Sequence, residues 1–205
     1  MADTADLADV AGAPGPVQQP LRQGKRVTLR GVDRSDFEFL YGLASAPDSG
    51  FRWRYRGATP SPDLFAAQLW DGVLAQFMVL DRGSGERVGV VSLYNASFQN
   101  GHAYLAASAA PAYRSSGYML DAALLFLDYT FTVWDLRKVY VETVEFNLPQ
   151  FASGMGKFLV EEARLRDHEF FAGRHWDMVF LSIGRSSFDE YSPRYLNALA
   201  EGRTR

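Results

Sequence analysis

Residues 110–118 are the part of the sequence best suited to binding a charged ligand, because they combine Arg114, Ser116 and Gly117. They follow a segment with strand character and precede a long apolar segment with helix character. Such a loop presents backbone N–H groups without helical partners and the positive end of the helix dipole, which together attract an anion. Gly117 lets a ligand approach the backbone closely, and Arg114 adds charged donors suited to a phosphate. The alternative is an ordinary strand-to-helix turn with Ser116 as the helix N-cap.

Other kinds of reactive site find little support in the sequence. The chain has no cysteine, which excludes disulfides, thiolate metal ligands and a cysteine nucleophile. Its histidines, His102, His168 and His175, lack the spacing of a zinc site. We therefore expect no metal ion in this protein.

The composition is that of an ordinary globular chain. Its 205 residues suit one domain with a tail, and 47% hydrophobic against 22% charged residues exclude whole-chain disorder and coiled-coil arrays. The 21 basic and 24 acidic residues give a net charge of −3, without the positive field of a general nucleic-acid binder. We expect no nucleic-acid or membrane partner, a cytoplasmic location, and either a monomer or a homodimer.

The chain divides into a central domain and two expected tails. Residues 1–24 are rich in Ala, Pro, Gly and Gln and lack the basic start and apolar core of a secretory signal, so we predict a flexible tail. Residues 25–190 form the predicted domain, and residues 191–205 a C-terminal tail. Residues 88–113 carry no charge, but polar side chains interrupt them too often for a membrane span.

Hydrophobic periodicity and capping signals predict the elements that position the loop. Polar–apolar alternation predicts a strand at 26–30, and Ser35 with Glu38 forms a candidate capping box for a short helix. Ser61 followed by Pro62 marks a second helix start. Three further strands are expected at 74–81, 87–98 and 102–108.

The second half of the chain predicts a strand–helix–strand unit. Residues 116–134 are apolar nearly all round, which indicates a buried helix, and the β-branched residues 139–144 follow it as a strand. A crossover helix between two strands makes them parallel neighbours. With two more strands at 159–169 and 175–184, the predicted fold is α/β: a mixed, mostly antiparallel sheet with a central βαβ unit flanked by helices.

The loop, the elements around it and their order resemble the GNAT superfamily of acyl-CoA-dependent acetyltransferases over about residues 26–183. The phosphate loop of that family has the pattern Gln/Arg-x-x-Gly-x-Gly/Ala. Arg114 and Gly117 match its first two fixed positions, and Met119 departs from the third. Further matches resemble the branch that acetylates ribosomal-protein N-termini and its small-molecule relatives. They are Pro111, Tyr113, Arg137-Lys138-Val139, Asn147 and residues 159–167.

The resemblance implies acetyl-CoA as co-substrate. In the family the loop amides bind the pyrophosphate, the end of the preceding strand pairs with the pantetheine arm, and an Asn lies beside the cofactor. The corresponding residues expected to bind coenzyme A are Ser108, Ala109, Arg114, Ser115, Ser116, Gly117, Tyr118 and Asn147.

Acetyl transfer to an amine calls for a general base. Deprotonating a lysine-like amine, with a pKa of about 10.4, costs about 4.6 kcal/mol at pH 7. Glu142 stands five residues before Asn147, where the resemblance implies a catalytic base, although it could be an outward-facing strand carboxylate. Glu145 and then His102 are the next candidates.

A general acid is less necessary, because a thiolate leaving group with a pKa of about 8.5 needs only about 2 kcal/mol of help at pH 7. Many relatives carry a Tyr seven residues after the Asn, where this chain has Gly154. Ser153, or water, is the candidate in its place. Together with Met119, this departure leaves open a fold that binds acyl-CoA without turnover.

Three arginines, Arg52, Arg54 and Arg56, alternate with Trp53 and Tyr55 where the resemblance places the acceptor wall. In a strand they share one face and could bind an anionic part of the acceptor. A solvated edge is the alternative, and binding of RNA has thin support on an acidic chain.

The sequence thus predicts an acyl-CoA-dependent N-acetyltransferase that moves an acetyl group to a primary amine of a small molecule. A protein N-terminal acetyltransferase and a non-catalytic acyl-CoA-binding or partner-binding protein are the alternatives. The sequence leaves the acceptor amine unidentified.

Overall fold

The computed structural model describes residues 21–46, 53 and 55–200. Arg52 and Arg54 lie outside these residues. The strands are β1 (Arg22–Gln23), β2 (Val27–Gly31), β3 (Val73–Asp81), β4 (Arg87–Ser97), β5 (His102–Ala109), β6 (Lys138–Val144), β7 (Leu159–Phe171) and β8 (Arg174–Gly184). The α-helices are α1 (Phe37–Ser45), α2 (Pro62–Gln68), α3 (Tyr118–Val133) and α4 (Arg185–Ala200); the 3₁₀ helices are η1 (Arg34–Asp36), η3 (Pro111–Tyr113) and η4 (Glu145–Phe151).

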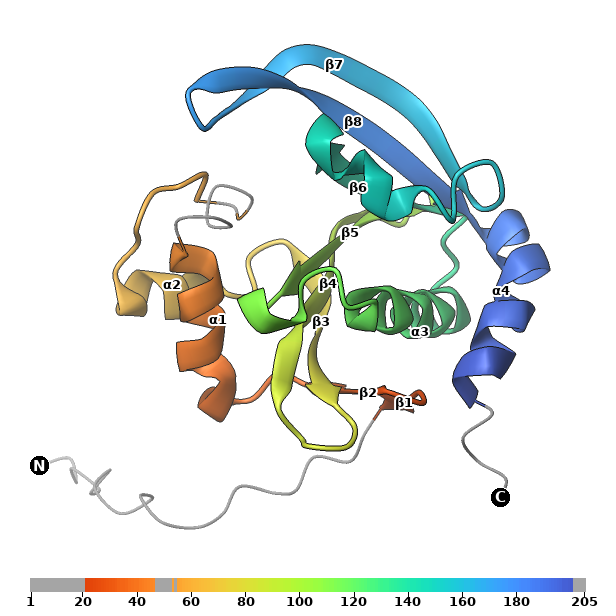
Figure 1. Ribbon diagram of the computed structural model, residues 1–205, viewed down its shortest axis with the longest axis horizontal. Coiled ribbons are helices and arrows are strands. Elements are labelled where there is room, and N and C mark those ends of the chain that lie inside the picture. Colours follow the sequence, from red (N-terminus) through yellow and green to blue (C-terminus); the bar gives the residue numbers. More distant parts are fainter. Residues whose placement is uncertain (1–20, 47–52, 54, 201–205) are drawn as a thin grey trace, which may run out of the picture.

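The strands form one sheet in the order β1-β2-β3-β4-β5-β6-β8-β7. All neighbouring pairs are antiparallel except β5 and β6, which are parallel and joined by the crossover helix α3. The predicted mixed sheet with a central βαβ unit is confirmed. Figure 1 shows the long β7–β8 hairpin reaching from α4 across β6 toward the side that carries α1 and α2.

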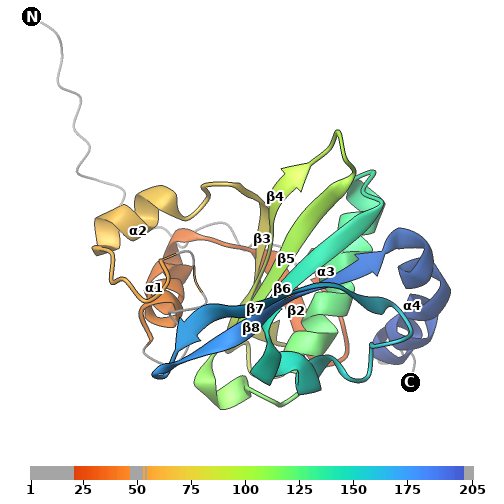
Figure 2. The same cartoon turned by 90° about the horizontal axis from the view of Figure 1, so that it is seen from above.

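Two apolar cores cover the two faces of the sheet, and Figure 2 shows the helices on either side of it. The larger core packs α3 and α4 against one face, around buried residues such as Val91, Phe126 and Val139. The smaller core packs α1 and α2 on the other face of β3 and β4, around Leu40 and Phe65. No helix in the described part of the chain is long and apolar enough to cross a membrane.

The parallel pairing of β5 with β6 is short. It joins His102–Tyr104 to Lys138–Tyr140 and then stops, whereas β5 stays paired with β4 as far as Ala109 and β6 with β8 as far as Val144. The two strands therefore diverge beyond Tyr104 and leave one edge of β5 without a neighbouring strand.

Regular elements extend into both of the expected tails. β1 lies inside the predicted tail 1–24, because it pairs with β2 and closes that edge of the sheet. Helix α4 continues to Ala200, past the predicted boundary at residue 190, because Tyr191, Tyr195 and Leu196 pack against the larger core.

The expected capping box at Ser35 and Glu38 is also displaced. Asp33 caps η1 instead, accepting from the N–H of Ser35, while Asp36 accepts from the N–H of Asp33. The reason lies in Asp36, which is fully buried and receives hydrogen bonds from Arg30 and Arg87. This aspartate ties the start of α1 to β2 and β4.

We predict that Asp36→Asn lowers the free energy of unfolding by about 3 kcal/mol, because it leaves two arginines beside a neutral, buried group. At 205 residues this corresponds to a fall in Tm of about 6–12 °C, measurable by calorimetry at pH 7. Asp71→Asn, at an exposed aspartate, is the matched control and should change stability by less than about 0.5 kcal/mol.

The difference in the free energy of unfolding between wild type and Asp36→Asn should also depend on pH. Burial alone would raise the pKa of Asp36, but hydrogen bonds from Arg30, Asp33 N–H and Arg87 outweigh it and lower the pKa. The stabilisation is therefore present above the ordinary carboxyl pKa and is lost as the pH falls through the lowered value. Equal stability of wild type and Asp36→Asn at pH 7 would contradict this role.

Candidate active site

A cavity of about 710 Å³ opens where β5 and β6 diverge. Its wall is built from β3, β4, β5, β6, η4 and the loop that follows β5. The residues that line it are Trp53, Arg56, Val73, Gln76, Val90, Ser92, Tyr94, Asn95, Ala106, Ala107, Ser108, Ala109, Tyr113, Arg114, Ser115, Met119, Glu142 and Gln150.

The loop between η3 and α3 has the backbone conformation of an anion site. Ser115 and Gly117 both have positive φ, +59° and +81°, and Gly117 is the residue before the first turn of α3. Within the described part of the chain, the N–H groups of Ser115 and Gly117 make no hydrogen bond. The predicted anion-binding loop therefore has backbone donors to offer at the N-terminus of α3.

Two tyrosines anchor this loop to the β3–β4 turn. The Tyr113 hydroxyl donates to Glu86 at 2.7 Å, and the Tyr118 hydroxyl donates to Asp81 at 2.6 Å. These bonds raise the pKa of Tyr113 to about 12 and that of Tyr118 above its ordinary value. Tyr118 is thus a hydrogen-bonded anchor rather than a simple packing residue.

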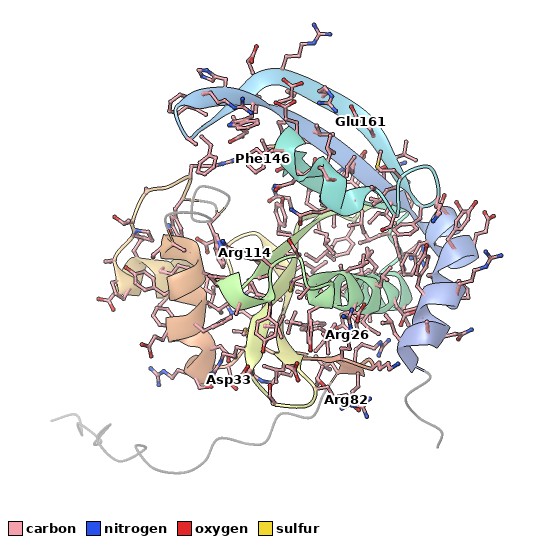
Figure 3. All side chains as sticks on the ribbon, in the orientation of Figure 1. Arg26, Asp33, Arg82, Arg114, Phe146 and Glu161 are labelled. Carbon is pink, nitrogen blue, oxygen red and sulfur yellow. The ribbon has the colours of Figure 1, made fainter. Side chains whose placement is uncertain are left out.

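The cofactor residues expected on β5 and the loop fall into two groups. Ser108, Ala109, Arg114 and Ser115 line the cavity, whereas Ser116, Gly117 and Tyr118 form the loop beside it. Figure 3 shows Arg114 projecting from the loop toward the side where Phe146 lies. The free edge of β5 runs along the cavity to the loop, as pairing with an extended ligand requires.

Asn147 lies in η4 and is 8% exposed. Its Oδ1 accepts a hydrogen bond from Nε2 of Gln150 at 3.2 Å, and Gln150 lines the cavity. Asn147 therefore supports the cavity wall through Gln150.

Glu142 is half-buried in the cavity wall, on β6 just beyond the last residue paired with β5. Burial raises the pKa of its carboxyl, and Arg56 and a hydrogen bond from the Tyr94 hydroxyl reduce that rise without cancelling it. Burial and the nearby Glu142 carboxylate raise the pKa of Tyr94 in turn, so its hydroxyl stays protonated as a donor. The cavity therefore contains a carboxylate, that of Glu142, whose basicity is increased by burial.

The strand register brings other polar groups into line with Glu142. Gln76 pairs with Ser92 across β3 and β4, and Ser92 pairs with Ala106 across β4 and β5. Ala106 and Glu142 are each two residues past the last β5–β6 pair, so all four share one face of the sheet. Gln76 is 4% exposed, and within the described chain its buried Nε2 has no hydrogen-bond partner.

Arg56 is the one predicted acceptor arginine among the described residues, and it does line the cavity. Its guanidinium donates to Glu169 of β7 at 2.9 Å. This ion pair joins the segment after α1 to the β7–β8 hairpin at the end of the cavity that holds Glu142.

Three alternative candidates lie elsewhere. Ser153 is exposed in the turn after η4 and does not line the cavity. Glu145 accepts from the N–H of Asp177. His102 packs against the rings of Tyr104 and Tyr140.

Sequence analysis missed Gln76, Tyr94 and Glu169. Each lies on a different strand from Glu142, and only the register of several pairings brings Gln76 and Tyr94 to the cavity and Glu169 to Arg56 beside it. The alternation of Gln76 and Ser92 with apolar neighbours in apolar strands was the available signal.

The family model described as "Acetyltransferase (GNAT) domain" matches residues 26–152, more than half of the chain. The chain therefore belongs to the GNAT acetyltransferase family. The predicted acyl-CoA-dependent N-acetyltransferase is confirmed, with acetyl-CoA as co-substrate.

Among known proteins, the chain is similar to the spermidine N(1)-acetyltransferase of Vibrio cholerae, with 24% identity over 166 residues, covering 80% of this chain and 95% of the relative. The spermidine N(1)-acetyltransferase of Escherichia coli K12 is 30% identical over 118 residues, or 56% of this chain and 62% of the relative. A solved structure of the Vibrio cholerae enzyme in complex with CoA and spermine superposes with a TM-score of 0.66 at 24% identity, covering 80% and 98% of the two chains. The structures share the fold, and the resemblance to the branch that acetylates ribosomal-protein N-termini stays a prediction.

We predict that Tyr94→Phe raises the pKa of Glu142 further, because the hydrogen bond that favours the carboxylate is lost while its burial remains. A titration of the glutamate side-chain carboxyl signals by NMR measures this directly. Tyr41→Phe removes a hydroxyl that donates to Pro60 O and is the matched control, without effect on Glu142. An unchanged or lower Glu142 midpoint in Tyr94→Phe would contradict the contact.

Proposed function

We propose that this acetyltransferase acts on a small aliphatic polyamine, with Glu142 accepting the proton of the amine that attacks the thioester. The observation that carries the proposal is the position of Glu142. Its carboxylate is half-buried in the cavity wall, two residues beyond the last pair between β5 and β6. The two similar proteins named above act on spermidine, which supports the acceptor class.

The charges at this end of the cavity favour a cation. Arg56 lies near Glu142 but forms an ion pair with Glu169. The positive charge of Arg56 is thus balanced by Glu169, and among the described residues the carboxylate of Glu142 has no ion-pair partner of its own. An ammonium group is attracted to such a carboxylate more strongly than in water, because the site is partly desolvated. This arrangement binds the amine as a cation and then provides the group that removes its proton.

Coenzyme A is expected to lie along the opposite part of the cavity. The loop N–H groups and the N-terminus of α3 would take the pyrophosphate, beside Arg114. The free edge at Ser108 and Ala109 would pair with the pantetheine arm, which directs the thioester toward Glu142. The proposal requires no metal ion and assigns no role to Ser153, since that side chain is exposed.

An N-terminal protein acceptor is the second candidate, and one contact weighs against it. The ion pair between Arg56 and Glu169 links the segment before α2 to the hairpin, beside the cavity that Arg56 lines. Such a link restricts a folded protein's N-terminus more than a slender amine.

The acceptor class is tested by release of free thiol from acetyl-CoA across a panel of amines. We expect kcat/KM for spermidine or spermine to exceed that for peptides with free N-termini by at least tenfold, a difference of about 1.4 kcal/mol in transition-state stabilisation. A preference for peptides would favour the N-terminal acetyltransferase. Binding of acetyl-CoA without thiol release for any amine would favour the non-catalytic alternative.

Glu142→Gln tests the base. Loss of a positioned base costs about 10²- to 10⁴-fold, so kcat should fall by this factor while the affinity for acetyl-CoA is kept. The wild-type activity should decline as the pH falls through the raised pKa of Glu142, and this acidic limb should disappear in the variant.

Glu145→Gln is the matched control, because Glu145 directly follows the same strand, as the first residue of η4, and does not line the cavity. It should change kcat by less than about threefold. A Glu142→Gln enzyme that keeps more than about a third of wild-type kcat, with its acidic limb intact, would show that Glu142 is not the base.

A further inference from the structure

Arg26, the residue before β2, is bound to the loop before α3 at a separation of 90 residues in sequence. Its Nη1 donates to the carbonyl of Ser116 and its Nη2 to the carbonyl of Gly117, both at 3.2 Å. Its Nε donates to Asp121 at 2.7 Å, and the guanidinium lies 5.0 Å from the ring centre of Tyr118. One side chain thus holds two successive peptide groups and the first turn of α3.

The geometry of the peptide bond turns these contacts into an orienting device. In a planar trans peptide the C=O and N–H groups point in opposite directions. Because Arg26 binds the carbonyls of Ser116 and Gly117, the N–H groups of Gly117 and Tyr118 point away from it. The Gly117 N–H makes no hydrogen bond within the described chain, whereas the Tyr118 N–H donates to Oγ of Ser116 at 3.4 Å. Both belong to the loop that the proposed function assigns to the pyrophosphate.

Arg26 also balances a charge that would oppose binding of an anion. The Asp121 side chain, 10% exposed, lies in the first turn of α3, where an unpaired carboxylate would repel a phosphate. The hydrogen bond to Asp121 raises the pKa of Arg26, which therefore stays charged. With the pair neutralised, the N-terminal dipole of α3 keeps its attraction for an anion.

Arg26 lies on the far side of the loop from the cavity. Arg114, Ser115 and Met119 line the cavity and Arg26 does not, and Figure 3 shows Arg26 and Arg114 on opposite sides of the loop. A Cβ at Gly117 would lie only 3.2 Å from Nη2 of Arg26, so the absence of a side chain at Gly117 leaves room for the guanidinium. Arg26 can therefore act on a ligand only through the loop.

We propose that Arg26 is a positioning residue for coenzyme A, which aims the loop N–H groups at the pyrophosphate and neutralises Asp121 behind them. The inference rests on the proposed placement of the pyrophosphate at this loop. It follows that Arg26 should matter only for a donor that carries a pyrophosphate.

The test compares acetyl-CoA with S-acetylpantetheine, a donor that has the same thioester and arm but no pyrophosphate. Arg26→Met should raise the KM for acetyl-CoA at least about tenfold and leave kcat at saturation within about twofold, because charged hydrogen bonds that orient the loop are lost. The kcat/KM for S-acetylpantetheine should stay within about twofold of wild type. Equal losses for both donors, or no loss for either, would overturn the proposal.

Arg22→Met is the matched control. Arg22 also pairs with a carboxylate of α3, Asp128, and lies over the ring of Tyr129, but has no contact with the loop. It should leave the KM for both donors unchanged. Arg26→Lys keeps the charge, but its single nitrogen lacks the planar fork that reaches two carbonyls and Asp121 from three separate nitrogens. An acetyl-CoA KM of Arg26→Lys equal to that of wild type would therefore also overturn the proposal.

Gly117→Glu separates this inference from the placement on which it rests. If Gly117→Glu raises the KM for acetyl-CoA and Arg26→Met does not, the placement stands and the role of Arg26 is wrong. If neither variant changes that KM, the pyrophosphate does not bind at this loop, and both proposals fail.

Discussion

The whole site depends on the early end of the parallel pairing between β5 and β6. After three residue pairs each strand follows a different neighbour: β5 stays with β4, and β6 stays with β8. The sheet therefore divides into two diverging halves, and a cavity opens between them. The same divergence leaves the edge of β5 without a neighbouring strand and puts Glu142 in the wall opposite it. A longer pairing between β5 and β6 would close the cavity and cover both the free edge of β5 and Glu142.

Two departures from the family's motifs are matched by changes elsewhere in the packing. Met119, in place of Gly or Ala, lies against Gly89. A Cβ at Gly89 would be 3.0 Å from the sulfur of Met119 and 2.2 Å from the carbonyl oxygen of Ser108. The absence of a side chain at Gly89 thus leaves room for the larger Met119. At Gly154, a Cβ would lie 2.6 Å from Cδ1 of Leu159 and 3.0 Å from the ring of Phe158, so a tyrosine at this position would require both side chains to shift. A thiolate leaving group needs little protonation at neutral pH, which makes the lack of that acid tolerable.

Local sequence patterns predicted most of this fold and only part of the site. The order of strands and helices, the buried helix α3 and the loop before it followed from periodicity and glycine placement, because these depend on neighbours in sequence. The contacts of Glu142 with Tyr94 and of Arg26 with the loop depend on register and on α3 crossing back over the sheet, which no short pattern encodes. At the N-terminal end, β1 has only two residues, too few to carry a hydrophobic pattern, although its partner β2 follows directly. At the C-terminal end, α4 is held by packing against distant parts of the larger core rather than by a strong local signal.

In the proposed function, the electrostatics of the cavity would divide it between two substrates of opposite charge. At one end the helix dipole and Arg114 would favour the anionic pyrophosphate; at the other, Glu142 would favour an ammonium group. As the proposed base, Glu142 must be basic enough to take the proton and yet remain ionised until the amine arrives. Burial makes the carboxylate more basic, while Tyr94 and Arg56 limit that effect. Proton transfer then neutralises both partners in a site where charge is costly, so the same burial that strengthens the base also favours formation of the neutral amine that attacks the thioester.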